Sequence, residues 1–310
     1  MELVEQFYTE IIPIGLWVAM LGLGLSLRTV DIRNIFASPK ALTIGMVGQV
    51  LLLPALGFTL AFLLAPTPAV AVGAVILAAC PGGLTANAYS FAARADVALS
   101  VSLTALSSLV SLVSLPAFTF LALEAFFEAG TMPTLSASDI FAKLFTLTVL
   151  PVGIGMLIRH RWPERSTALI ETVRTGTLIF LIFLIGVGTI ISLDDLREHF
   201  ARTFTVAASM NVLSMIMGFA LGALFSLRVP QRVAITFEIG VQNLALASLI
   251  AVTMLENREF FIVTLVYGIV MKITAMGFMF AARRWLARDA AATAQAPAGT
   301  MTGGLPESSR

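Results

Sequence analysis

The chain has 310 residues and a formal net charge of +1 at pH 7, and 58% of its residues are hydrophobic whereas only 12% are charged. Its mean hydropathy is +0.95. A water-soluble domain is nearer half apolar and a quarter charged, because its exterior needs charge for solubility. The composition therefore predicts an integral membrane protein. The small net charge gives no field that would favour nucleic acid, and Cys80, as the single cysteine, excludes a disulfide within the chain.

Apolar segments long enough to cross a bilayer recur along the chain. A spanning helix needs about 20 mostly apolar residues. Roughly nine segments meet this requirement, near residues 10–27, 41–65, 68–92, 97–123, 137–158, 169–192, 203–226, 230–254 and 260–282. Glu2, Glu5 and Glu10 have the wrong sign for a cleaved signal peptide, so the first segment is expected to stay as a span. Residues 1–288 are expected to form one transmembrane domain, and residues 289–310 a disordered cytoplasmic tail.

Positive charges cluster in alternate connections, after the odd-numbered segments. They are Arg28, Arg33, Lys40, Arg94, Arg159, Arg161, Arg165, Arg228, Arg232, Arg283, Arg284 and Arg288. Because cytoplasmic loops carry an excess of Lys and Arg, the pattern predicts a multi-pass protein of the cell (inner) membrane. Its N-terminus is expected outside and its C-terminus in the cytoplasm, which an odd number of spans also requires.

Two segments contain breaks in the apolar pattern. In the third, Pro81 removes a backbone donor, and Gly82 and Gly83 lower the preference for helix. A broken helix at membrane depth is tolerated only inside protein or beside a watery cavity. The motif therefore predicts an interrupted helix, and a simple proline kink is the plainer alternative.

The eighth segment places a carboxylate in apolar surroundings. Burying Glu238 in hydrocarbon costs roughly 3 kcal/mol on insertion scales, which pairing, protonation or ion binding must offset. Gln242 lies four residues later and shares a helix face with Glu238, and Asn243 is adjacent. A hydrogen-bond network without a ligand is the plainer interpretation, but three acid or amide groups so close together exceed what such a network needs.

Side chains in other segments have the same chemical character. Ser100 and Thr104 lie four residues apart in the fourth segment, and Gln49 is isolated in the second. Hard cations prefer such oxygen donors, and one carboxylate among neutral oxygens suits a monovalent cation better than calcium. Paired interrupted helices near the membrane midplane indicate a secondary transporter, and their helix N-termini favour an anionic substrate group.

The chain resembles the bile acid:sodium symporter family over roughly residues 10–285. The resemblance is carried by Pro81-Gly82-Gly83 with Asn87, by residues 97–101 with Thr104, by residues 238–243 and by Gln49. It implies an all-α membrane protein of about nine transmembrane helices, with a core domain built from inverted repeats and a panel domain. In the core, the third and eighth segments would be unwound and would cross.

The resemblance also implies two sodium sites behind that crossing. The first would use Asn87, Ser100, Thr104 and Glu238. The second would use Gln49, Glu238, Gln242 and the backbone carbonyls of Ile239 and Val241. The organic anion would lie in front of the crossing, near Thr85, Ala86, Asn87 and Asn243.

The chain departs from the family pattern at two places. Ala86 replaces a hydroxyl that normally joins the first sodium site, and Thr85 stands one position away. Lys272 lies inside the ninth segment, where a buried lysine is costly. Three interpretations of Lys272 stay open: snorkelling, a pair with Glu238 that would reduce the sodium count to one, or a contact with a substrate carboxylate.

The leading hypothesis is symport of a small organic anion, a bile acid or a monocarboxylate-like acid, with one or two sodium ions by alternating access. A proton-coupled or facilitative organic-acid carrier is the alternative. An enzyme is not expected, because the segments hold no His–Glu zinc motif, no paired aspartates and no Ser–His pair at membrane depth. Besides the anion and sodium, membrane lipid is the expected partner, and nucleic acid is not.

Overall fold

The computed structural model describes residues 12–26, 38–127, 145–164, 193–244 and 259–295, together with single residues between these ranges. Most of the predicted sixth span at 169–192, and the predicted tail beyond 295, lie outside the described residues. The described chain is helical, and two residues within it, Gly82 and Gln242, form an isolated β-bridge. The predicted all-α membrane architecture is confirmed at this level.

The helices follow one another with short connections where the structure describes them. In chain order they are α2 (Ile12–Ser26), α4 (Pro39–Val47), the π-helix η3 (Gly48–Leu52), α5 (Leu53–Leu64), α6 (Pro68–Ala79), α7 (Leu84–Ala93), α8 (Val97–Phe126), the π-helix η4 (Phe145–Val149), α10 (Leu150–Arg161), α12 (Leu193–Leu224), α13 (Val229–Gly240) and α15 (Glu259–Gln295).

Within the described residues, four stretches are long and apolar enough to cross a membrane as continuous helices: Pro39–Leu64, Val97–Phe126, Thr203–Leu224 and Ile262–Arg288. They coincide with the second, fourth, seventh and ninth predicted spans. The third predicted span is divided into α6 and α7, and the eighth is interrupted after α13. The apolar helices thus enclose two interrupted ones, whose free backbone groups need partners inside the protein.

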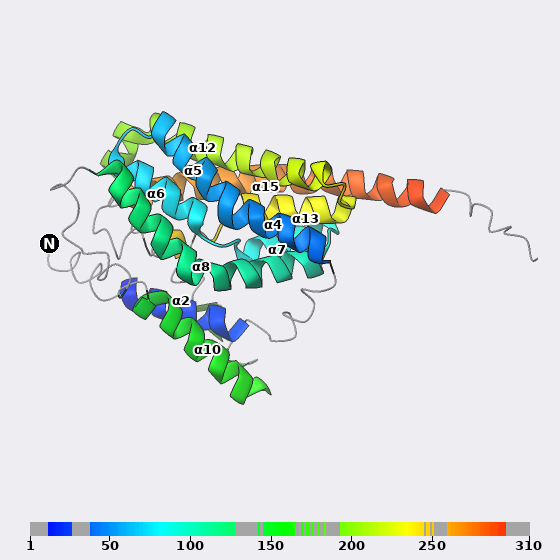
Figure 1. The fold of residues 1–310 in the computed structure, drawn as a ribbon, viewed down its shortest axis with the longest axis horizontal. Coiled ribbons are helices and arrows are strands. Elements are labelled where there is room, and N and C mark those ends of the chain that lie inside the picture. The colour runs from blue at the N-terminus through cyan, green and yellow to red at the C-terminus, as the bar shows by residue number, and fades with distance from the viewer. Residues whose placement is uncertain are drawn as a thin grey trace, which may run out of the picture.

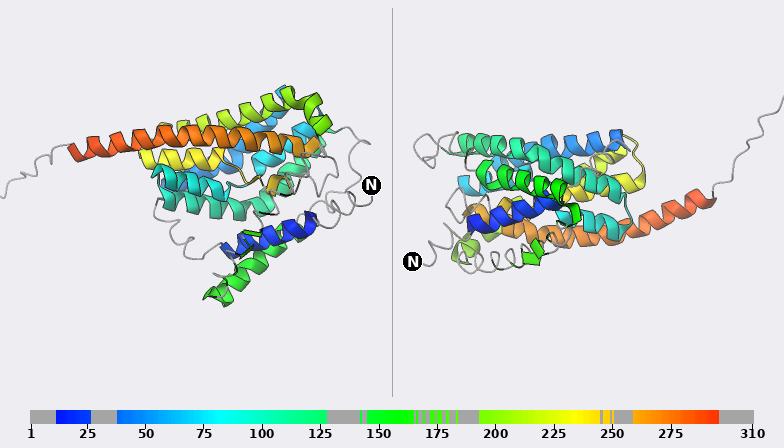
Figure 2. Two further views of the ribbon diagram at one scale, coloured as in Figure 1. Left: turned by 180° about the vertical axis from the view of Figure 1, so that it is seen from behind. Right: turned by 90° about the horizontal axis from the view of Figure 1, so that it is seen from below.

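The helices fall into two groups (Figure 1). The larger group is a bundle of α4 to α8 with α12, α13 and α15, and its core is built from small apolar residues of α6 and from α13. Helices α2 and α10 pack together along one side of that bundle, and the view from behind shows the same separation (Figure 2, left). The C-terminal part of α15 projects past the end of the bundle.

Glycines bring α2 and α10 into backbone contact. A Cβ on Gly24 would lie 2.2 Å from the carbonyl oxygen of Val152, and one on Gly155 would lie 2.4 Å from that of Leu21. Small residues allow membrane helices to approach this closely, which increases their van der Waals contact. The two helices therefore form one closely packed unit beside the bundle.

The two interruptions meet inside the larger bundle. Helix α6 ends at Ala79, and the backbone is extended at Cys80 and at Gly83. Helix α13 ends at Gly240, and Val241 is extended. The extended pieces pair as a short antiparallel ladder. In it the Gly83 N–H donates to the Val241 carbonyl (2.9 Å), and the Asn243 N–H donates to the Pro81 carbonyl (3.1 Å). We call this ladder the crossing.

Candidate ion and substrate site

Glu238 lies in the last turn of α13, immediately before the crossing. Its side chain is 0% exposed, so the carboxylate faces protein and not lipid. The Thr104 hydroxyl of α8 contacts one carboxylate oxygen, Oε2, at 2.9 Å. The other oxygen, Oε1, is buried and has no hydrogen-bond partner among the described residues. A buried carboxylate oxygen without a partner is energetically costly, and an ion at this position would compensate it.

Asn87, Ser100 and Thr104 gather beside the Oε2 side of that carboxylate. The Ser100 hydroxyl donates to Asn87 Oδ1 at 2.7 Å, and Thr104 Oγ1 lies 3.2 Å from the same oxygen. Thr104 Oγ1 also lies 3.1 Å from the Ser100 carbonyl. A threonine hydroxyl has only one hydrogen to donate, whereas three acceptors surround this one. The cluster therefore has more oxygen lone pairs than protons, which favours a cation.

Gln49 and Gln242 form a second group, beside the crossing. Gln49 lies in the π-helix η3, a helical defect that frequently occurs at functional sites. Its amide nitrogen donates to the Cys80 carbonyl at 2.9 Å and to Gln242 Oε1 at 3.0 Å. Gln242 in turn donates to the Ile239 carbonyl at 2.7 Å. The remaining amide oxygen, Gln49 Oε1, is buried without a hydrogen-bond partner in the described part of the chain.

The side chains that the resemblance assigns to sodium therefore form two groups of contacting residues next to the two interruptions. Thr104 joins Glu238 to Asn87, and Gln49 joins Gln242 to the first interruption. The oxygen atoms that could bind an ion belong to one carboxylate and to neutral amide, hydroxyl and carbonyl groups. Among the described residues, no hydrogen-bond donor contacts the buried acceptors Glu238 Oε1 and Gln49 Oε1. This donor set fits a hard monovalent cation such as sodium.

The substrate residues divide between the two sides of α7. Ala86 is 0% exposed, whereas the Thr85 side chain is exposed and Asn87 is half-buried. The Thr85 hydroxyl therefore does not replace the one that Ala86 lacks in the cluster around Asn87. Asn243 is half-buried just after the crossing, where its Oδ1 accepts the Leu246 N–H at 3.1 Å and caps the following helical turn.

Lys272 lies apart from this cluster. Its side chain is exposed on α15, on the same face as the exposed Ile269, Ile273 and Met276. Because Glu238 Oε1 has no hydrogen-bond partner in the described residues, the pair between Lys272 and Glu238 that was one of three interpretations is absent here. Snorkelling and a substrate contact remain for Lys272.

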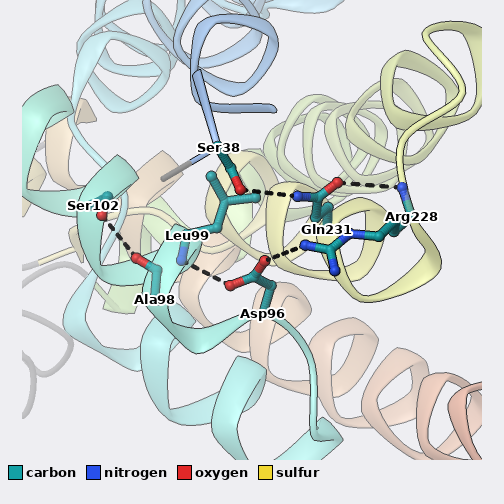
Figure 3. A network of polar contacts seen from close by, with 7 residues as sticks. All are labelled: Ser38, Asp96, Ala98, Leu99, Ser102, Arg228 and Gln231. Atoms are coloured by element: carbon teal, nitrogen blue, oxygen red, sulfur yellow. Dashed lines mark hydrogen bonds and ion pairs between the residues drawn. The ribbon is translucent and has the colours of Figure 1, made fainter. Parts of the chain in front are cut away.

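A polar network fixes one end of the helices that carry the site (Figure 3). Asp96 accepts the Leu99 N–H at 3.1 Å as the N-cap of α8, and it faces Arg228 at 3.8 Å. Gln231, in the first turn of α13, donates to Ser38 at 3.3 Å just before α4. The starts of α4, α8 and α13 are therefore tied together, which sets the position of Thr104 relative to Glu238.

Three functional candidates lie outside the sequence-based set. Asn211 of α12 and Tyr267 of α15 both donate to the carbonyl of Gly240, and Thr274 contacts Asn211. Asn211 is a lone amide within an apolar span, as Gln49 is, so the same signal was present in the sequence. Tyr267 and Thr274 carry no comparable signal, because such residues are common in membrane helices.

Comparisons with known proteins find relatives among sodium-dependent transporters. Residues 13–199 match the model of the sodium bile acid symporter family. The chain is 26% identical over 240 residues to the uncharacterized sodium-dependent transporter YocS of Bacillus subtilis. The aligned region covers 77% of this chain and 73% of YocS. The chain is 25% identical over 307 residues to the human ileal sodium/bile acid cotransporter, covering 97% and 86%. It is 27% identical over 251 residues to the probable sodium/metabolite cotransporter BASS2 of rice chloroplasts, covering 81% and 58%.

Proposed function

This chain belongs to the sodium bile acid symporter family, and from that premise we propose that it carries a small organic anion across the membrane together with sodium, by alternating access. The observation that carries the proposal is the pair of buried acceptor oxygens, Glu238 Oε1 and Gln49 Oε1, which lack hydrogen-bond donors beside the crossing. Because a buried carboxylate needs a counter-charge, a bound cation gives these two atoms a common partner.

Two sodium sites share the Glu238 carboxylate in this proposal. The first consists of Asn87, Ser100, Thr104 and Glu238 Oε2, which already contact one another. The second consists of Gln49, Glu238 Oε1, Gln242 and the carbonyls of Ile239 and Val241. Its two donor-free oxygens support sodium binding at the second site most directly. The first site lacks a hydroxyl at Ala86, so the protein binds one or two ions depending on whether that site fills.

The two helix groups take different roles in the proposed cycle. We assign the bundle of α4 to α8, α12, α13 and α15 to the core domain, and α2 with α10 to the panel domain. The close glycine contact between α2 and α10 supports their movement as one body. Sodium binding neutralises Glu238 and tightens the crossing, so that sodium and substrate affinities are reciprocally coupled. The charge pattern supports a cytoplasmic C-terminus.

The substrate site lies in front of the crossing, near Thr85, Ala86, Asn87, Asn243 and Lys272. Helix α7 begins at Leu84, directly after the crossing, and a helix N-terminus attracts a negative group. Relatives are named for bile acids and for metabolites, so an organic solute is the class that their names share. We propose a small carboxylate as the cargo.

The proposal is tested with purified protein and with uptake into cells or vesicles. A panel of organic anions is first screened for stabilisation in sodium against potassium, and the hits are used in uptake assays. Glu238→Gln removes the charge while keeping the side-chain shape, and we expect it to abolish sodium-dependent uptake and the sodium-specific rise in Tm. Glu124→Gln makes the same change on an exposed position of α8 and is expected to behave as the unmodified protein.

Three outcomes decide between the proposed function and its alternative. Robust uptake by Glu238→Gln in sodium-free buffer contradicts sodium coupling through this carboxylate. Uptake by the unmodified protein that follows an imposed proton gradient and ignores sodium identifies a proton-coupled carrier. Uptake that needs neither gradient identifies a facilitative one.

A further inference from the structure

The carbonyl of Gly240 has unusual partners for the end of a helix. In an uninterrupted helix it would accept the N–H of Leu244, four residues later. Here the Leu244 N–H contacts the Gln242 carbonyl instead, at 3.0 Å. The Gly240 carbonyl accepts two side-chain donors from other helices, Asn211 Nδ2 of α12 at 2.9 Å and Tyr267 Oη of α15 at 3.0 Å. Both of its lone pairs are therefore used, which leaves none for an ion.

The two donors are themselves held in place. Asn211 and Tyr267 are both 0% exposed, so neither exchanges its partner for water. The Thr274 hydroxyl of α15 contacts Asn211 Oδ1 and fixes which way the amide points. A Cβ on Gly240 would lie 2.3 Å from Met215 Cγ, so glycine at this position lets α12 approach the end of α13. Three helices thus converge on one carbonyl.

The carbonyls on either side of Gly240 have different partners. The Ile239 carbonyl accepts from Gln242 Nε2 at 2.7 Å, and the Val241 carbonyl accepts from the Gly83 N–H at 2.9 Å. Both partners belong to the crossing. Successive carbonyls of an extended backbone point to opposite sides, and Val241 is extended, with φ −114° and ψ 90°. Holding the Gly240 carbonyl toward α12 and α15 therefore turns the Val241 carbonyl toward the crossing. The Ile239 carbonyl lies one residue earlier, in the last turn of α13, so anchoring Gly240 also restricts its direction.

We propose that Asn211 and Tyr267 are positioning residues for sodium, which orient the carbonyls of Ile239 and Val241 by holding the carbonyl between them. Neither residue touches the ion. The inference rests on the proposed second sodium site, in which those two carbonyls are ligands. Groups that orient the ligands of a metal typically alter its affinity by about 10- to 100-fold when they are removed. The loss of one of the two donors on Gly240 is expected to weaken sodium binding at the lower end of that range.

The decisive variant is Tyr267→Phe, which removes one hydroxyl and keeps the buried ring. Sodium is titrated against the Tm of the purified full chain at constant ionic strength with potassium, and the half-saturating sodium concentration is compared with that of the unmodified protein. We expect it to rise by about tenfold. We also expect a change in the preference for sodium over lithium, because the spacing of the carbonyl ligands changes. Asn211→Leu should act in the same direction.

The matched control is Tyr89→Phe, a second hydroxyl removal in the same bundle, at a ring that stacks on Phe237. It is expected to leave the sodium titration unchanged. A Tyr267→Phe protein with a lower Tm in potassium but an unaltered sodium titration overturns the inference, since the hydroxyl would then only stabilise the fold. If the unmodified protein shows no sodium response, the proposed sodium coupling itself fails. If Asn211→Leu does not fold, the result for Tyr267→Phe alone decides.

Discussion

Gly82 and Glu238 lie so close together that a methyl group on the glycine would overlap the carboxylate. A Cβ on Gly82 would be 2.0 Å from Glu238 Oε1 and 2.4 Å from its carboxylate carbon. The oxygen without a hydrogen-bond partner therefore lies directly against the backbone of the first interruption. The absence of a side chain at position 82 is what lets the carboxylate reach the crossing.

Gly82→Ala is expected to disrupt the crossing and the ion site together. The added methyl group must displace either the carboxylate or the backbone that pairs with Gln242, and overpacking of this kind costs about 1–3 kcal/mol. We expect the half-saturating sodium concentration to rise at least about tenfold and sodium-dependent uptake to fall accordingly. Gly153→Ala is the control, because a Cβ at that helical position meets nothing within 4 Å. An unaltered sodium titration in Gly82→Ala would contradict the assigned geometry.

Gln49→Leu is expected to lower stability and to remove the sodium response. The substitution leaves the Cys80 carbonyl and Gln242 Oε1 without the amide donor, and an unpaired buried acceptor costs about 1–3 kcal/mol. It also removes a proposed ion ligand. The Tm is measured in potassium and in sodium. We expect a lower Tm than that of the unmodified protein in both salts, and no difference in Tm between the two salts.

Gln231→Leu separates these two effects, because Gln231 is another buried amide with two hydrogen bonds, to the backbone of Arg228 and to Ser38, but it lies at the far end of α13 from the site. It should lower the Tm while keeping the difference between sodium and potassium. A sodium response that survives in Gln49→Leu would remove Gln49 from the ion site.

Ala86→Ser is expected to strengthen sodium binding at the first site. Ala86 is fully buried on the side of α7 away from the exposed Thr85, so a hydroxyl there adds an oxygen that the cluster around Asn87 lacks. We expect a steeper dependence of uptake on sodium concentration, measured as the Hill coefficient. Thr85→Ala should leave the Hill coefficient unchanged. An identical sodium dependence in Ala86→Ser and the unmodified protein would show that the first site does not depend on that hydroxyl.

Lys272→Met is expected to weaken anion transport without altering sodium binding. The lysine is exposed on α15 and does not pair with Glu238, so its charge is free to meet a substrate carboxylate. We expect the KM for the anion to rise about tenfold, equivalent to about 1.4 kcal/mol, while the sodium-dependent Tm shift persists. Lys272→Arg should retain most of the uptake. A KM that is the same in Lys272→Met would favour snorkelling as the only role of this side chain.

Local chemistry made the interrupted helices and the ion cluster predictable. Pro81 and its two glycines stop α6, and the buried carboxylate of Glu238 demands oxygen or cation partners from the rest of the fold. The helical spacing placed Ser100 and Thr104 on one face, and both contact Asn87. These features depend on a few neighbouring residues, so a sequence pattern is sufficient to identify them.

Other features depend on packing between distant segments and had no local signal. The second span was expected as one plain helix, whereas its residues Gly48–Leu52, which include Gln49, form the π-helix η3. Asn211 meets Gly240 only because α12 lies against α13, and Tyr267 approaches the same atom from α15. A single asparagine or tyrosine in an apolar segment does not indicate which distant residue it will contact.

The crossing is held by peptide groups, from Gly83 to Val241 and from Asn243 to Pro81. Replacing a side chain nearby leaves those groups in place, unless the new residue is a proline. Exposed positions such as Thr85 and Lys272 are therefore free to diverge through evolution while the pairing beneath them persists. A protein with this architecture can therefore change its transported anion through substitutions at a few exposed positions and keep the same ion site.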